Sequence, residues 1–185
     1  KRRFVELGFI GFDSESSKVE SKRLFEDIET GTITPPQFRC GLRKFFPGTV
    51  TDKQLDDAWN AMLLDIPEPR IKLLENLRIT YRIFLLSNTN EIHYMKYFNN
   101  FRRQYGYPDF DALFEKAYFS YRIGLKKPDL EIFRYVLQTS GLNPSETLFI
   151  DDTLQHVEGA RAAGIHAYHL QVQQGEQITG IFQNE

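Results

Sequence analysis

The sequence contains little cysteine and has no long apolar run. Cys40 is the single cysteine among 185 residues, so no disulfide can form within the chain, which favours a reducing compartment. We expect Cys40 to be a small buried helix residue. No apolar stretch approaches the roughly 18 residues of a membrane span, and the first residues, KRRFVELGF, lack the longer apolar core of a signal peptide. The sequence therefore predicts a soluble, cytoplasmic protein.

An excess of one charge is also lacking. The chain has 23 Lys and Arg residues against 25 Asp and Glu residues, which leaves a net charge of −2. This balance argues against nucleic acid or an anionic membrane as the partner, so any site that binds an anion must be local. The length suits one domain, with or without a smaller one attached to it.

Residues 1–66 show apolar residues at helical spacing and no strand pattern. Thr34 and Thr51 stand where helix N-caps are expected, and Trp59 lies on an apolar stripe that predicts a place in the core. Three helices are predicted here, over 18–30, 34–46 and 51–66. Arg39 can either face solvent or serve the function of this region.

From about Pro67 the pattern changes to helices and strands in alternation. Strands are predicted over 81–87, 116–120, 147–151 and 166–170. Helices are predicted between and before them, over 69–80, 90–106, 129–141 and 153–164. Such alternation is typical of an α/β fold with a mainly parallel sheet covered by helices. The strand over 81–87 is expected to be buried on both faces.

Ligands of open parallel sheets bind beyond the carboxyl ends of the strands. After the first strand come Ser87 and Asn88, whose hydroxyl and amide could hold a phosphate at the start of the next helix. The alternative is an ordinary helix N-cap. After the second strand come Lys126 and Lys127, before Pro128. A lysine held there could contact a phosphoryl oxygen or a carboxylate cluster, or it could simply be solvated.

The third strand ends in two adjacent carboxylates, Asp151 and Asp152. Like charges in one poorly solvated place disfavour each other, so the pair predicts a compensating cation. Mg²⁺ fits, because it binds through one or two carboxylates while keeping several waters. The alternative is that Asp152 caps the following helix, with Gln155 completing the cap.

Taken in order, these three strand ends resemble the second, third and fourth motifs of the haloacid dehalogenase-like (HAD) hydrolase superfamily. The segments FLLSNTN, SYRIGLKKPDLEIF and LFIDDTLQHVEGARAAGI resemble the signatures of that family over their whole length. Residues 1–66 resemble its inserted helical-bundle cap, and 67–185 resemble its Rossmann-like core. IETGTITPPQF and DAWNAMLLDIP are similar to members that are small sugar-phosphate phosphatases.

The resemblance implies a role for each marked residue. Ser87 and Asn88 would bind the phosphoryl group, Lys127 would steady the nucleophile and the transferring group, and Asp152 with Asp151 would hold magnesium. The catalytic residues expected here are therefore Lys127 and Ser87.

This sequence departs from the family pattern in two places. His156 stands where the family often has asparagine, and we expect it to be a partly exposed helix histidine rather than a proton-transfer group. The first motif, a strand that ends in the nucleophilic aspartate, is missing. Asp13 in FIGFDSES is a poor candidate, because two glycines weaken the stretch before it as a strand. The expectation is a nucleophile outside this chain, on some 15–25 further N-terminal residues.

The predicted function is a magnesium-dependent phosphatase for a small phosphorylated metabolite, with a sugar phosphate favoured and an aspartyl-phosphate intermediate. A 2-haloacid dehalogenase is one alternative, although that branch needs no metal and replaces the Asp pair with a less acidic motif. A non-catalytic HAD-like binding module is the other. The expected partners are the metabolite and, in a homodimer, a second copy of the chain; a monomer is equally expected.

Overall fold

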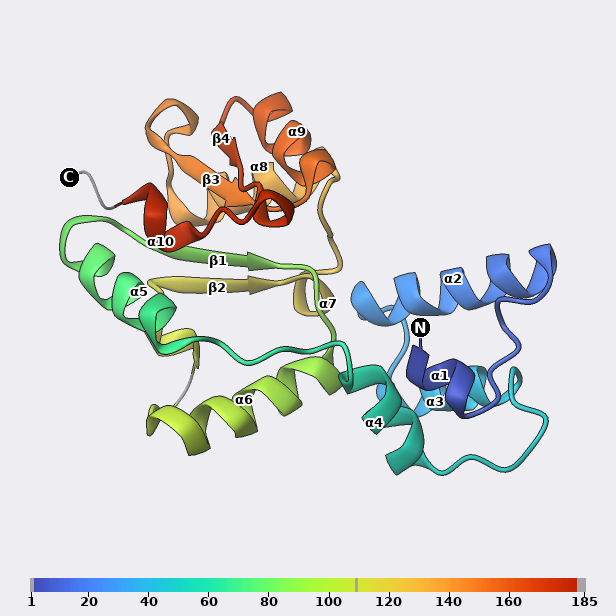
Figure 1. Cartoon of the computed structure of the whole chain (residues 1–185). Helices are drawn as coiled ribbons and strands as arrows, with labels where there is room; N and C mark the ends of the chain where they lie inside the picture. The colour runs from blue at the N-terminus through green and yellow to red at the C-terminus, as the bar shows by residue number, and fades with distance from the viewer. Residues whose placement is uncertain (1, 109, 183–185) are drawn as a thin grey trace. The chain divides into compact units, whose positions relative to one another are not determined.

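The computed structural model describes residues 2–108 and 110–182 (Figure 1). The chain divides into two compact units. The first contains residues 1–65, 88–112 and 119–124, and the second contains 66–87, 113–118 and 125–185. None of the helices in the described ranges combines the length and the apolar character that crossing a bilayer requires.

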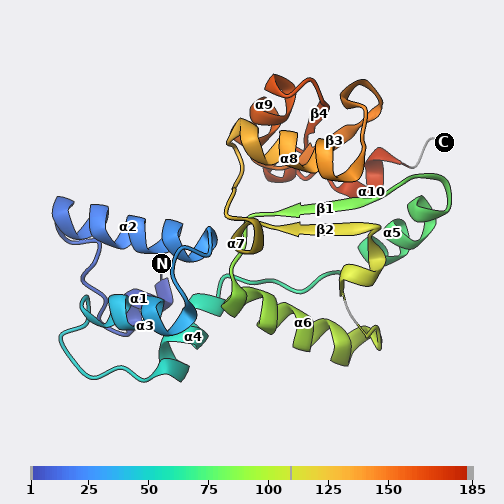
Figure 2. The ribbon, with the colours of Figure 1, turned by 180° about the vertical axis from the view of Figure 1, so that it is seen from behind.

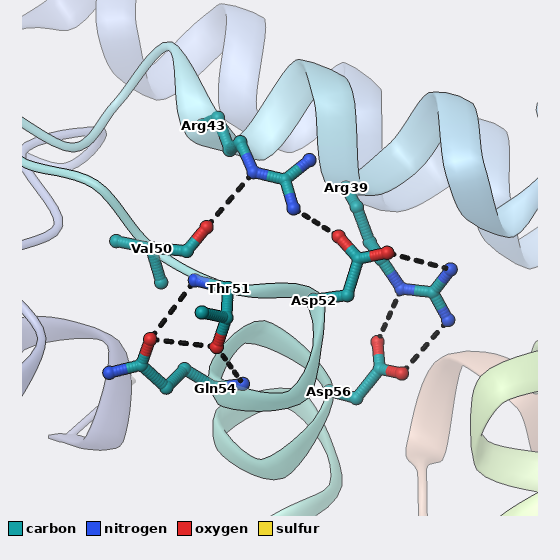
Figure 3. A network of polar contacts seen from close by, with 7 residues as sticks. All are labelled: Arg39, Arg43, Val50, Thr51, Asp52, Gln54 and Asp56. Carbon is teal, nitrogen blue, oxygen red and sulfur yellow. Dashed lines mark hydrogen bonds and ion pairs between the residues drawn. The ribbon is translucent and has the colours of Figure 1, made fainter.

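The first unit is built from helices. They are α1 (Arg2–Glu6), α2 (Glu15–Glu29), α3 (Pro35–Arg43), α4 (Asp52–Asn60), α6 (Glu91–Tyr105) and α7 (Ser120–Ile123). The predicted N-caps at Thr34 and Thr51 are confirmed. At α4, Thr51 Oγ1 accepts the N–H of Gln54, and Gln54 Oε1 accepts the N–H of Thr51, which satisfies donors at the helix start (Figure 3).

Aromatic side chains form the core of the first unit. Trp59 is 6% exposed, as its apolar stripe predicted, and its ring stacks on Phe25 at a centroid distance of 4.9 Å. Other buried members of this core are Phe4, Phe9, Phe38, Phe45 and Phe46. The prediction for Cys40 was wrong, because this residue is exposed. Phe38 and Leu42, four residues apart, define the buried face of α3, and Cys40 lies between them on the other face.

The second unit alternates helices and strands as predicted. Its strands are β1 (Phe84–Ser87), β2 (Lys116–Phe119, whose last residue belongs to the first unit), β3 (Leu148–Asp151) and β4 (His166–His169). Its helices are α5 (Glu68–Thr80), α8 (Leu130–Ser140), α9 (Leu154–Ala162) and α10 (Ile178–Ile181). Short 3₁₀ turns are η1 (Phe110–Leu113), η2 (Pro144–Glu146) and η3 (Val172–Gln174). Helix α9 packs against β3 and β4, and α8 lies beside α9 (Figure 2).

The strands form two separate pairs. β1 pairs with β2, and their arrows run in the same direction (Figure 1). β3 pairs in parallel with β4, with Leu148 opposite His166 and Asp151 opposite His169. The expected α/β architecture with parallel strands is thus confirmed. β1 is half-buried rather than buried on both faces, because among the described residues it has a single strand neighbour.

Candidate active site

Lys127 connects the carboxyl ends of two strands in the second unit. Its Nζ donates hydrogen bonds to Asp151 Oδ2 at 2.6 Å, at the end of β3, and to Leu86 O at 2.9 Å, in β1. The side chains of Lys127 and Asp151 are 8% and 9% exposed. Both ions have lost their hydration, so the burial of each is tolerated only while the other stays close to it in a good hydrogen-bonding geometry. The residues marked by the second, third and fourth motifs thus approach one another at Leu86, Lys127 and Asp151.

Asp151 has both carboxylate oxygens engaged. Oδ2 accepts from Lys127, while Oδ1 accepts the N–H of Thr153 at 2.8 Å and contacts His156 Nδ1 at 3.0 Å. Burial alone would raise the pKa of Asp151, but the charge and hydrogen bond of Lys127, the Thr153 N–H and His156 together lower it. Asp151 is therefore ionised at neutral pH. An ionised carboxylate only accepts hydrogen bonds, so Nδ1 is the nitrogen of His156 that donates.

Asp152 differs from its neighbour in exposure and in contacts. Its side chain is exposed, and among the described residues no group donates a hydrogen bond to its carboxylate. The alternative that Asp152 caps α9 is wrong, because the N-cap position is Thr153 and Asp151 accepts the Thr153 N–H. The Asp152 carboxylate is left available for a ligand.

The donor set fits magnesium. Within the described ranges, no cluster of three or more His, Cys, Asp or Glu side chains is arranged to hold a metal. Mg²⁺ needs only one or two carboxylates, because waters and a substrate phosphate complete its coordination. Asp152 could supply a direct carboxylate oxygen, and the ionised Asp151 adds negative charge beside it.

Ser87 ends β1 with its hydroxyl uncommitted. It is half-buried, and the described residues offer its hydroxyl no hydrogen bond. Helix α6 is instead capped by Asn90, whose Oδ1 accepts the N–H of His93 at 3.1 Å. The residue of this stretch that caps the helix is therefore Asn90, and the Ser87 hydroxyl is available for a phosphoryl oxygen. Asn88 is half-buried and begins the segment that belongs to the first unit.

Two supports of Lys127 were not visible in the sequence. One is the carbonyl oxygen of Leu86, which any residue at that position would provide. The other is Gly159 in α9, where a Cβ atom would lie 2.3 Å from Pro128 O and 2.8 Å from the Phe133 ring. Glycine therefore lets α9 pack directly against the Lys127-Pro128 turn. The small residues of EGARAAG are the sequence feature that could have predicted this close packing.

Asp13 lies away from any strand end. It is exposed, in a turn of the first unit between α1 and α2, and its N–H bonds to Ile10 O. Among the described residues, the only strand that ends in an aspartate is β3.

The chain is similar to known proteins in sequence and in structure. The sequence model of haloacid dehalogenase-like hydrolases matches residues 37–164. D-ribitol-5-phosphate phosphatase from Bacteroides thetaiotaomicron is 28% identical over 165 residues, which are 89% of this chain and 80% of that protein. A crystal structure of a HAD-family enzyme from the same organism has a TM-score of 0.89 and 36% identity, covering 99% of this chain and 89% of that one.

A further structure of that enzyme, in complex with magnesium and inorganic phosphate, has a TM-score of 0.83 and 38% identity. It covers 98% of this chain and 89% of the other. The chain belongs to the haloacid dehalogenase-like hydrolase family.

Proposed function

We propose that the natural substrate is the phosphate monoester of a small sugar or polyol. The protein is a hydrolase of phosphate esters, and Mg²⁺ is its cofactor. The single observation that carries the proposal is the buried Lys127–Asp151 pair next to Asp152, whose carboxylate has no ion-pair partner among residues 2–108 and 110–182. D-ribitol-5-phosphate phosphatase as a relative supports a polyol phosphate in particular.

Each residue of this site has a chemical task in phosphoryl transfer, which needs mainly positioning and charge neutralisation. Asp152, with Asp151 behind it, would hold magnesium, which neutralises negative charge on the phosphoryl oxygens when bound. The Ser87 hydroxyl donates to a phosphoryl oxygen, and Asn88 adds a polar group beside it. Lys127 places a positive charge between the ends of β1 and β3, where it orients the nucleophile and the transferring group.

The reaction proceeds through an aspartyl-phosphate. A carboxylate oxygen forms a bond to phosphorus while the bond from phosphorus to the ester oxygen breaks, and the leaving alcohol takes up a proton. Water then cleaves the acyl phosphate to release inorganic phosphate and regenerate the carboxylate. β1 and β3 each have one strand partner within the described residues. We propose that the strand carrying the nucleophilic aspartate pairs between them, next to Lys127.

Several finer assignments belong to the same proposal. Residues 1–66 would act as the cap that selects the substrate, and 67–185 would act as the catalytic core. The protein would work in the cytoplasm, as a monomer or homodimer, on a small metabolite.

The test is a substrate screen of the full-length protein. Ribitol 5-phosphate, other sugar phosphates, nucleotides and 2-haloacids would be compared with and without Mg²⁺. Turnover of a sugar or polyol phosphate that needs Mg²⁺ supports the proposal. Release of halide without metal favours the dehalogenase alternative. Binding without any turnover favours the non-catalytic module.

A further inference from the structure

Ser120 makes a reciprocal hydrogen-bonded pair with the main chain of Thr89, 31 residues away in the sequence. Its hydroxyl accepts the N–H of Thr89 at 2.9 Å and donates to the Thr89 carbonyl oxygen, also at 2.9 Å. Ser120 is 0% exposed, and both residues belong to the first unit. One hydroxyl thus satisfies both main-chain groups of one residue, as a neighbouring strand would.

These two bonds fix consecutive peptide planes. The N–H of Thr89 belongs to the peptide that joins Asn88 to Thr89, and the carbonyl belongs to the peptide that joins Thr89 to Asn90. Asn90 is in turn held as the N-cap of α6 by its bond to the His93 N–H. The chain is therefore fixed from the residue after Ser87 to the first turn of α6.

The same bonds limit which groups can bind phosphate. Helix N-termini bind phosphate through main-chain N–H groups that have no partner inside the protein. The N–H of Thr89 is committed to Ser120, so it is not one of these donors. Phosphate recognition at this turn therefore depends on the groups that remain, Ser87 and Asn88, and on the orientation that the fixed turn gives to them.

We propose that Ser120 is a positioning residue for phosphate recognition, acting through Thr89 on the turn that carries Ser87. The inference rests on the proposed phosphatase function. Ser120 contacts neither the substrate nor the metal. Without its hydroxyl, both peptide planes lose a hydrogen bond, so the turn holds the Ser87 hydroxyl less firmly in one position.

The experiment compares Ser120→Ala with Ser21→Ala in the full-length protein. Ser21 is a matched control, because it is 1% exposed in the first unit, and its hydroxyl donates to the Gly11 carbonyl oxygen at 3.0 Å. Both variants lose a buried hydroxyl bonded to main chain, and both should unfold at a lower temperature. Ser120→Ala alone should raise the KM for the substrate and the inhibition constant of inorganic phosphate by about tenfold, the effect of one hydrogen bond.

If Ser120→Ala does not fold, the conservative variant Ser120→Cys tests the same inference. Ser120→Cys has a side chain of similar size that is a weaker hydrogen-bond donor. It should raise the KM and the inhibition constant by a few fold, which is less than the increase expected for Ser120→Ala. Constants that stay at the wild-type value in a folded Ser120 variant would overturn the inference while leaving the phosphatase function intact. A wild-type protein that neither hydrolyses phosphate esters nor is inhibited by phosphate would overturn the function, and the inference with it.

Discussion

The two units use charged side chains in opposite ways. In the first unit, Arg39 donates two hydrogen bonds of 2.8 Å to Asp56, while Asp52 contacts both Arg39 and Arg43 (Figure 3). Every charge of this network has an opposite charge beside it, and the network joins α3 to α4. At the end of β3 in the second unit, Lys127 and Asp151 are paired, but the ranges that the structure describes hold no such partner for Asp152.

This difference separates structural charges from functional ones. A network whose charges are all paired stabilises the fold and offers little to a ligand. An exposed carboxylate that lies beside a buried ion pair and is not part of it keeps its charge available for a cation. Arg39, which the sequence left open between two roles, is paired within this network, and Asp152 is the charge that we propose takes part in the chemistry.

The largest expected effect comes from breaking the buried pair. Lys127→Met leaves Asp151 buried and unpaired, so the free energy of unfolding should fall by about 3–5 kcal/mol, as measured by urea denaturation. The rate of hydrolysis should also fall, by roughly one to two decades. Lys126→Met is the matched control, because Lys126 is half-buried and does not bond to Asp151. Equal losses in the two variants would contradict the assignment of Lys127.

A variant of Asp152 should separate chemistry from stability. Asp152→Asn should lower kcat by roughly two to three decades, because a bound metal contributes several kcal/mol to phosphoryl transfer. The melting temperature should not change, since the side chain is exposed and has no protein partner in the described residues. Asp57→Asn, at an exposed carboxylate of the first unit, should leave kcat at the wild-type value. A large loss of stability in Asp152→Asn would place this residue among the structural charges.

A variant in the charged network of the first unit should lose stability and keep its catalytic constants. Arg39→Lys cannot keep both bonds to Asp56, so the free energy of unfolding should fall by about 1 kcal/mol. The two side chains are 19% and 28% exposed, which keeps this effect above that of a fully solvated pair. Steady-state kinetics should show unchanged kcat and KM. A changed KM would show that Arg39 also contacts the substrate.

The smallest expected effect is a dependence of stability on pH. Burial lowers the pKa of His93 below 6.5, and its bond to the Trp59 carbonyl opposes this only in part. The unfolded chain therefore binds a proton at a pH where the folded protein does not. Stability from this group is present above pH 6.5 and declines as the pH falls from there toward the lower pKa of the folded state.

His93→Gln removes that titration. The slope of the free energy of unfolding between pH 7.5 and 5.5 should be shallower in this variant than in the wild type, as measured by denaturant titrations at each pH. Identical slopes for His93→Gln and the wild type would contradict this, because they would show that folding does not change the pKa of His93.

The sequence predicted the positions of the site better than its contacts. Lys127 and Asp151 could be found because parallel strands bring their carboxyl ends to one edge, which is a rule of topology. The bonds of Asp151 to Thr153 and His156, and of Lys127 to Leu86, depend on side-chain directions that no spacing rule supplies. Burial was predicted wrongly for Cys40 and β1, because it depends on which helix face and which strand edge find a neighbour.

The central claim is that a carboxylate pair at the end of β3 makes this protein a magnesium-dependent phosphatase. The most direct measurement is the rate of phosphate release from ribitol 5-phosphate by the full-length protein, first in excess chelator and then as Mg²⁺ is restored. Release should be absent in chelator and should return with Mg²⁺ in the wild type, while Asp152→Asn should stay nearly inactive throughout. Undiminished phosphate release in excess chelator would contradict the claim.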